Sequence, residues 1–292
     1  MDVGVCLPYM ERDYGRKEIL AWCRAIDGGP FSSLSTGERI TGYTLEMRSL
    51  LAAAAAVTER VRIVPSLYVL PMHDAVWAAK EIATLDVLSE GRVTVTVGVG
   101  GREVDYRAVG ASFARRHARM DEQVARMRAI WAGETPFDGA DMVGPTPVQA
   151  GGPPILAGSM GPKAMARAAQ WAQGVYSFSM NGELDETKRM FDLARDAWEK
   201  AGRTEPPRLV GGFWYSLASD AEARLRKYVY EYLKVFGDPM ANGVAGTMTR
   251  HTPDAVAEAI ENLRRAGSDE IFLVPTTADI AEIERVAPLV EA

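Results

Sequence analysis

The chain has 292 residues, of which 47% are hydrophobic and 25% are charged, a composition typical of a globular protein. Its formal net charge of −6 argues against a nucleic-acid-binding protein, because binding a polyanion usually needs a basic surface. Two cysteines, Cys6 and Cys23, make no disulfide framework, and three histidines lack metal-ligand spacing, so we expect neither disulfides nor a metal site.

We also expect a cytoplasmic protein that is not inserted in a membrane. The first residues, Met1-Asp2-Val3-Gly4, do not form the basic and then apolar pattern of a signal peptide. The longest apolar run, residues 50–57, is too short to cross a bilayer.

Short apolar runs alternate with segments of helical period along the whole chain, which is typical of parallel β-α units. In the first half we predict strands at residues 3–7, 31–35, 61–70 and 92–97, and helices at 17–26, from about 45, at 75–88 and around 120–131. The third strand is interrupted at Pro65-Ser66, where we expect a break or a bulge because proline cannot donate a hydrogen bond to the ladder.

Residues 133–154 contain five prolines and little periodicity, and we interpret them as a surface excursion because the alternation resumes directly afterwards. The second half then predicts strands at 154–157, 175–178, 208–217 and 270–274, with helices between them. One of these helices, 253–266, starts with proline after Thr252 as its N-cap. We therefore expect one domain over residues 1–292 with eight strands.

Eight parallel strands can close into a (β/α)8 TIM barrel or remain an open, doubly wound sheet. An open sheet of this kind usually carries a glycine fingerprint for a dinucleotide after its first strand, and Leu7-Pro8-Tyr9 offers none. The pattern therefore favours the barrel.

Several motifs make the chain recognisable. They are Thr58-Glu59-Arg60-Val61-Arg62-Ile63, Leu70-Pro71, Ala79-Lys80-Glu81, Thr84-Leu85-Asp86-Val87-Leu88-Ser89-Glu90-Gly91-Arg92-Val93, Gly98-Val99-Gly100-Gly101, Arg116, Met120-Asp121-Glu122, Trp131 and Pro153-Pro154-Ile155-Leu156. In combination they resemble the bacterial-luciferase-like superfamily of luciferase-like monooxygenases and F420-dependent oxidoreductases. The resemblance covers most of the chain. It implies a barrel in which a flavin or deazaflavin ring lies at the C-terminal ends of the strands, over a bulge in the third strand.

The candidate cofactor phosphate site is Gly158-Ser159-Met160-Gly161-Pro162-Lys163, between the fifth strand and its helix. Small residues let backbone N–H groups approach an anion, the start of a helix adds partial positive charge, and Lys163 could add a full one. A simple tight turn is the alternative reading. In the F420-using branch of the family a similar Gly-Pro-Lys segment holds the cofactor phosphate, so the resemblance favours coenzyme F420 over FMN.

Two further segments are candidates for contact with the ring. Pro65-Ser66-Leu67 matches the third-strand bulge, where relatives commonly carry a non-prolyl cis peptide that supports the ring from one face. Gly98 and Gly100 end the fourth strand, where either close approach to the cofactor or a loop that needs positive φ would require glycine.

Glu38 is the candidate catalytic residue, because it follows the second strand near the point where relatives place a histidine or an aspartate for proton transfer. A glutamate buried beside the ring could act as acid or base, whereas a solvated pair with Arg39 is the alternative. His73 does not match the family histidine, and we expect it to be an exposed loop residue.

Other side chains are less specific. Gln173 replaces an aspartate that is structural in relatives. A group of aromatic residues near strand ends could line a substrate pocket, although such residues are more often core: Phe178, Phe213, Trp214 and Tyr215.

Three functions remain open from the sequence. The first is hydride transfer between F420 and a small organic substrate, with the chemistry supplied by the cofactor. The second is an FMN-dependent monooxygenase, and the third is a non-catalytic barrel paralogue that binds a small ligand. A homodimer is expected by analogy with the family.

Overall fold

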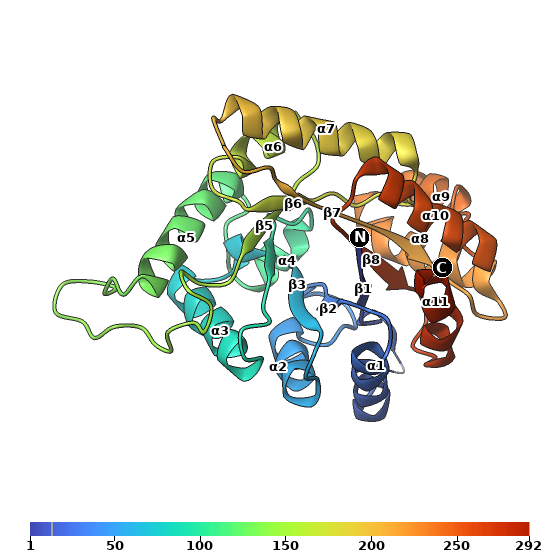
Figure 1. Ribbon diagram of the computed structural model, residues 1–292, viewed down its shortest axis with the longest axis horizontal. Helices are drawn as coiled ribbons and strands as arrows, with labels where there is room; N and C mark the ends of the chain where they lie inside the picture. Colours follow the sequence, from blue (N-terminus) through green and yellow to red (C-terminus); the bar gives the residue numbers. More distant parts are fainter. Residues whose placement is uncertain (13, 292) are drawn as a thin grey trace.

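The computed structural model describes residues 1–12 and 14–291. Eight parallel strands pair in chain order, and β1 pairs with β8 to close the barrel (Figure 1). The strands are β1 (Asp2–Cys6), β2 (Ser33–Thr36), β3 (Arg62–Tyr68), β4 (Val95–Val97), β5 (Ile155–Gly158), β6 (Gly174–Tyr176), β7 (Arg208–Tyr215) and β8 (Glu270–Pro275). The closed ring confirms the TIM barrel and excludes the open sheet.

Helices surround the barrel in chain order (Figure 1). The α-helices are α1 (Arg16–Gly28), α2 (Met47–Val57), α3 (Ala75–Leu88), α4 (Glu103–Ala108), α5 (Arg116–Trp131), α6 (Pro162–Ala168), α7 (Leu184–Lys200), α8 (Ala221–Leu233), α9 (Asp238–Gly246), α10 (Pro253–Ala266) and α11 (Ala281–Glu291). Two short 3-10 helices are η1 (Leu70–Met72) and η2 (Lys234–Phe236). Within the described residues, no helix combines the length and the apolar composition needed to cross a membrane.

The ends of several helices follow from their capping residues. The Thr252 side chain accepts a hydrogen bond from the Ala255 amide, which confirms the predicted start of α10. Helix α2 begins at Met47, slightly later than predicted, because the Glu46 carboxylate accepts from the first free amides. Of the break or bulge predicted in β3, the structure has the bulge: the strand is continuous, and its register with β4 shifts between Ser66 and Tyr68.

The interior of the barrel is layered, because alternate residues of each strand point inward. The first layer, at the N-terminal ends, is ionic: Glu270 is 2% exposed and bonds Arg62 at 2.7 Å, Arg208 at 3.0 Å and the Ser33 hydroxyl. Asp2 of β1 pairs with the same Arg62.

Two residues further along the strands, the second layer is apolar. It is a separate cluster whose members come from β3, β5, β7 and β8, on different sides of the ring, so their side chains meet inside it: Val64, Leu156, Val210 and Phe272. The third layer, at the C-terminal ends, is where an open cavity begins.

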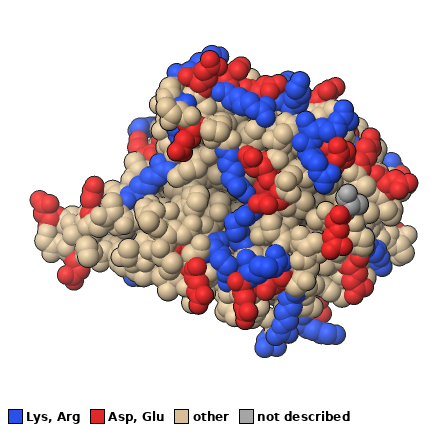
Figure 2. Space-filling model, in the orientation of Figure 1, with Lys and Arg blue, Asp and Glu red and all other residues tan. Residues whose placement is uncertain are grey.

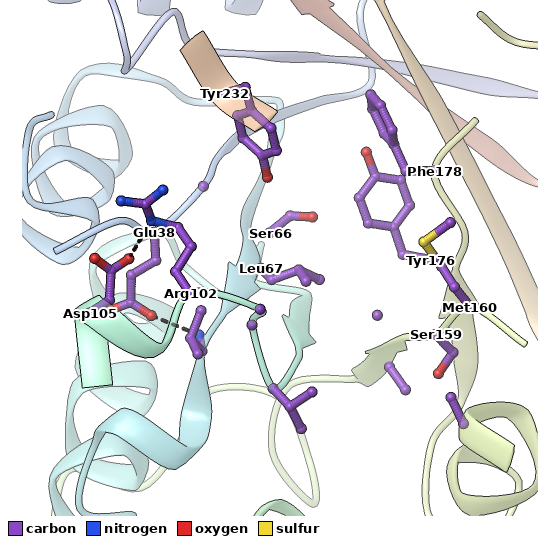
Figure 3. A pocket seen from close by; sticks show the side chains of 18 of the residues that line it. Glu38, Ser66, Leu67, Arg102, Asp105, Ser159, Met160, Tyr176, Phe178 and Tyr232 are labelled. Carbon is purple, nitrogen blue, oxygen red and sulfur yellow. Dashed lines mark hydrogen bonds and ion pairs between the residues drawn. The ribbon is translucent and has the colours of Figure 1, made fainter. Parts of the chain in front are cut away.

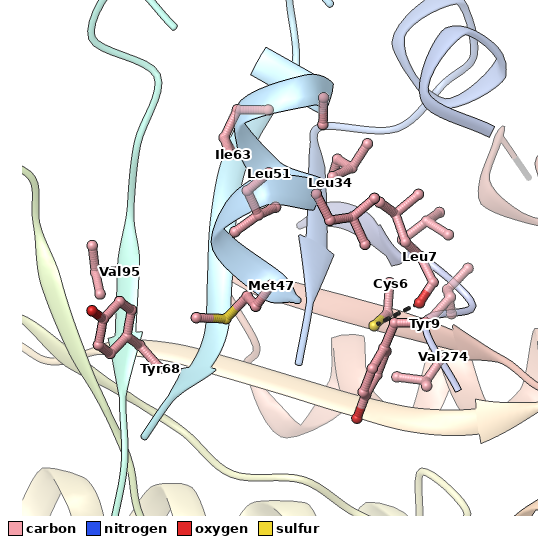
Figure 4. Close-up of a cluster of buried hydrophobic side chains, with 14 of the residues drawn as sticks. Cys6, Leu7, Tyr9, Leu34, Met47, Leu51, Ile63, Tyr68, Val95 and Val274 are labelled. Atoms are coloured by element: carbon pink, nitrogen blue, oxygen red, sulfur yellow. Dashed lines mark hydrogen bonds between the residues drawn. The ribbon is translucent and has the colours of Figure 1, made fainter. Parts of the chain in front are cut away.

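A larger apolar core fills the space between the ring and the helices. Figure 4 shows part of it, where Leu34 of β2 and Ile63 of β3 lie near Met47 and Leu51 of α2. All four side chains are at most 2% exposed. Burial of this kind supplies most of the folding free energy and fixes the strand ends that carry the site.

Residues 133–154 form the predicted excursion, which projects from the barrel between α5 and β5 (Figure 1). The segment contains Glu134, Asp138 and Asp141 but no lysine or arginine, and acidic side chains mark it on the left of Figure 2. Elsewhere on that face basic and acidic side chains are intermixed. The C-terminal end of the segment is held by Asp86 of α3, whose carboxylate accepts hydrogen bonds from the Gln149 amide and side chain.

Candidate active site

A cavity of about 510 Å³ opens at the C-terminal ends of the strands. All eight strands contribute lining residues at or just beyond their ends, for example Cys6 at the end of β1, Glu38 after β2 and Val274 on β8. This is the face at which barrels of this type carry their active sites. The volume is in the range of small-molecule pockets.

The floor of the cavity is the bulge of β3, where Ser66 and Leu67 line the space and the peptide bond between them is cis (Figure 3). The expected bulge and cis peptide are therefore present. Pro65 belongs to the same segment but does not line the cavity.

Two glycines make room for Leu67. A Cβ atom at Gly98 would lie 2.6 Å from Leu67 Cδ1, and one at Gly158 would lie 2.4 Å from Leu67 Cδ2. Gly98 itself does not line the cavity, so its glycine is required by the packing of Leu67. Gly100 does line it and has a φ of +58°, a conformation that strongly favours glycine.

Glu38 and His73 form a nearly buried pair. Their side chains are 4% and 11% exposed, and His73 Nε2 lies 2.6 Å from Glu38 Oε1. The Val69 amide donates to the other carboxylate oxygen at 2.7 Å. The expectation that His73 is an exposed loop residue is wrong, because η1 turns its ring back against Tyr68, 4.7 Å away between ring centroids.

Glu38 lines the cavity and, within the part of the chain that the structure describes, its carboxylate bonds His73 and the Val69 amide but not Arg39, so the solvated Glu38–Arg39 pair is not formed. Each carboxylate oxygen has two lone pairs, so Glu38 can accept a further hydrogen bond from a ligand in the cavity. The arrangement therefore suits a group that holds or accepts a proton.

A second charged cluster lies beside Glu38 in Figure 3. Arg102, just after β4, bonds Asp105 at 3.0 Å, and the Thr41 amide donates to the same carboxylate. Burial opposes ionisation of Asp105, but the Thr41 hydrogen bonds and the Arg102 charge outweigh it and lower the pKa of this carboxyl. Asp105 is therefore a fixed anion that orients Arg102 at the cavity wall.

The predicted phosphate segment is only partly at the cavity. Gly158, Ser159 and Met160 line it, whereas Gly161, Pro162 and Lys163 do not, and Lys163 is exposed. Helix α6 has seven residues, so its partial charge is small and side chains must supply most of the attraction for an anion.

The cationic side chain that does line this end is Arg167, one turn further along α6, paired with Asp121 at 3.0 Å. His117 lies at the same end, and burial together with the charges of Arg116 and Arg167 lowers its pKa. Neither Arg167 nor His117 was predicted from the sequence. Arg167 could have been found as a second basic residue four positions, or about one helical turn, after Lys163. His117 could have been found from its place in the first turn of α5.

Aromatic side chains form the opposite wall in Figure 3. Tyr176 and Phe178 contact each other edge to face, and Phe178 makes a second contact of this kind with Trp214. Trp214 in turn packs on Tyr232, which also lines the cavity. Of the aromatic candidates, Phe178 and Trp214 therefore line the cavity, while Phe213 and Tyr215 are fully buried in the core.

The residues present fit a planar, partly polar ring system. The walls are mainly apolar and aromatic, and the Ser66 hydroxyl is buried at the floor with no hydrogen-bond partner among the residues that the structure describes. Such an orphaned group costs free energy until a ligand satisfies it. Among the described residues no group of three or more His, Cys, Asp or Glu side chains could hold a metal ion.

Comparison with known proteins gives the relatives of this chain. The model of one family, described as luciferase-like monooxygenase, matches residues 1–291. An uncharacterized protein of Mycobacterium tuberculosis is 35% identical over 177 residues, 57% of this chain, and the match spans only 61% of that relative's length. The FMNH2-dependent dimethylsulfone monooxygenase of Pseudomonas putida is 24% identical over 262 residues, 75% of this chain and 70% of the relative. The solved structure of an F420-dependent secondary alcohol dehydrogenase is similar with a TM-score of 0.78 and 18% identity, covering 99% of this chain and 98% of the other.

Proposed function

Because the chain belongs to the luciferase-like monooxygenase family, we propose that it is an oxidoreductase that transfers a hydride between coenzyme F420 and a small organic substrate. The observation that carries this proposal is the cavity above Leu67, with its aromatic wall and the unpartnered hydroxyl of Ser66. The similarity to an F420-dependent dehydrogenase and the segment from Gly158 to Lys163 favour F420 over FMN. The proposed unit is a single domain over residues 1–292.

In this proposal Leu67 and Ser66 would hold the ring of the cofactor, which would supply the hydride chemistry when bound. The Ser66 hydroxyl could donate or accept a hydrogen bond there. The aromatic wall excludes water from the opposite side, where Tyr176 remains a neutral hydroxyl because burial raises its pKa. Cys6 remains a neutral thiol, since burial raises its pKa to about 12.

Glu38 is the proposed catalytic residue. Its carboxylate faces the cavity, where it would take the proton of a substrate hydroxyl or return one to a carbonyl. His73 is a positioning residue, because its bond to Oε1 and the Val69 amide bond to Oε2 fix the plane of the carboxylate.

The anionic tail of the cofactor is proposed to lie over Gly158, Ser159 and Met160. Arg167 supplies the positive charge there, and the exposed Lys163 adds a weaker, screened contribution from outside the cavity. A bound anion would also stabilise the protonated form of His117.

An FMN-dependent monooxygenase is the second candidate, favoured by the sequence similarity to the Pseudomonas putida enzyme. Both functions use the same cavity, so cofactor choice separates them. The expected homodimer stays a prediction.

The test is titration of the purified chain with F420 and with FMN, followed by cofactor fluorescence. We expect F420 to bind with a Kd in the micromolar range or below, and Arg167→Gln to weaken it roughly tenfold or more, as expected for loss of a charge-assisted contact. Lys163→Ala should cost less. Nuclear magnetic resonance of His117 should show its pKa rise on binding. Micromolar binding of FMN without F420 would replace this proposal with the monooxygenase, and binding of neither would leave the non-catalytic barrel.

A further inference from the structure

A second, positively charged cleft lies beside the cavity, between the loops that follow β1, β2 and β8 and the helix α8. We call it the basic cleft. Its volume is about 930 Å³, and two carboxylates, Glu11 and Glu231, lie in its lining. Six cationic side chains line it: Arg12, Arg39, Arg102, Arg224, Lys227 and Lys234.

Half of these cations are already neutralised. Arg102 pairs with Asp105, Arg224 with Asp220 and Lys234 with Glu231. The other three, Arg12, Arg39 and Lys227, form no ion pair with any carboxylate in residues 1–12 and 14–291. The basic cleft therefore has an excess of positive charge within a chain whose formal net charge is −6.

Arg39 is the most informative of the unpaired cations. Its guanidinium lies over the Tyr232 ring, 5.8 Å from the centroid, and its Nη1 contacts the Met10 sulfur at 3.6 Å. Its Nε is buried and has no hydrogen-bond partner among the described residues. A thioether is a weak acceptor, so this guanidinium retains most of its capacity to donate.

Thr276 gives an independent indication of a ligand. It directly follows β8, lines the basic cleft and is 1% exposed, and its hydroxyl has no hydrogen-bond partner in the part of the chain that the structure describes. Buried polar groups in native proteins are nearly always satisfied, so two orphaned donors in one cleft need an acceptor. Carboxylates and phosphates accept from both an arginine and a hydroxyl.

We propose that the basic cleft binds the anionic group, a carboxylate or a phosphate, of the substrate whose reacting carbon lies in the cavity. This inference rests on the proposed function. Arg102 and Tyr228 line both spaces, and Tyr232, on which Arg39 stacks, lines the cavity. One molecule can therefore reach from the cleft to Glu38. The cofactor tail lies at the other end, near Arg167.

The experiment uses the whole, cofactor-free chain at low ionic strength and two probes. Inorganic phosphate is followed by the 31P linewidth and succinate by saturation-transfer difference spectroscopy. The variants are Arg39→Gln and Thr276→Val, the second of which keeps the side-chain shape. The matched control is Arg226→Gln on the same helix α8, an arginine whose side chain is 47% exposed, pairs with Glu222 and lines neither space.

We expect at least one probe to bind, Arg39→Gln to weaken it roughly tenfold or more, Thr276→Val to weaken it severalfold and Arg226→Gln to leave it unchanged. Thermal unfolding of each variant shows whether it still folds. If Arg39→Gln does not fold, the effect of Thr276→Val on probe binding decides the test. The preferred probe decides between a carboxylate and a phosphate.

Three outcomes separate this inference from the proposed function. Absence of binding by both probes overturns the inference, and so does binding that neither variant weakens. If Arg39→Gln lowers the affinity for F420 as strongly as for phosphate, the cleft holds the cofactor tail, so the inference fails while the proposed function stands. If the probes bind as expected but F420 does not, the cofactor assignment fails while the anion site stands.

Discussion

Replacing Gly158 with alanine should deform the floor of the cavity. The new Cβ would lie 2.4 Å from Leu67 Cδ2 and 2.9 Å from Leu67 Cδ1. Leu67 would have to move by roughly 1 Å to restore an ordinary carbon–carbon separation of about 3.5 Å. Gly98 also lies close to Leu67, since a Cβ there would be 2.6 Å from Leu67 Cδ1, so the leucine has little free space around it.

The cost of such overpacking is about 1–3 kcal/mol in the free energy of unfolding. At roughly 2–4 °C for each kcal/mol, the melting temperature of a domain of this size falls measurably. The loss of binding free energy for the cofactor should be a larger fraction of its total than the loss of unfolding free energy, because the displaced Leu67 would lie under the proposed ring.

Urea unfolding and F420 titration measure the two effects. The double variant Gly158→Ala, Leu67→Ala should recover part of the stability lost by the single variants, with a coupling of about 0.5–3 kcal/mol. Gly243→Ala is the matched control, because this glycine lies inside α9 and, apart from its own helix, no described atom lies within 4 Å of an added Cβ. The reasoning is refuted if Gly158→Ala is as stable as Gly243→Ala and shows no coupling to Leu67.

Two further predictions concern buried carboxyl groups. Burial raises the pKa of Glu282 to about 7 from an ordinary value of 4.5, so the folded chain holds a proton that the unfolded chain has lost, and stability should fall by about 3 kcal/mol in total as the pH rises from about 4.5 to 7. Urea unfolding measured across this pH range should show that the free energy of unfolding depends less on pH in Glu282→Gln. An unchanged pH dependence in this variant would exclude Glu282 as its source. For Glu38, alanine should cost about 3 kcal/mol because it leaves the Val69 amide and His73 unpaired, whereas Glu38→Gln should stay nearly as stable yet lose turnover. Equal stability of these two variants in urea would contradict the geometry of the pair.

Regular elements were predictable wherever periodicity and capping agreed. The helix 75–88 and the helix 253–266 occur with the predicted bounds, since the Asp74 and Thr252 side chains cap their first turns. The fourth strand was predicted too long: it begins at Val95 rather than at residue 92, because only one bridge, from Val93 to Ile63, precedes it. An apolar pattern alone cannot show where ladder pairing starts.

The site was less predictable because it depends on the directions of side chains. Glu38 was a candidate, but its partner His73 comes from a turn after the neighbouring strand, and only that turn brings the two together. Lys163 was a candidate because of its place in a motif, whereas Arg167 was not predicted. Since α6 is only seven residues long, its sequence does not reveal which side chain faces the cavity.

The ionic layer at the N-terminal end has a consequence for synthesis on the ribosome. Glu270 of β8 is the buried partner of Arg62 and Arg208, and β8 also forms the seam with β1. Until β8 has emerged, the two arginines lack this counter-charge and the edge of β1 has no neighbour on that side. Exposed edges invite pairing with foreign strands, so the nascent chain is most vulnerable to aggregation before its last strand appears.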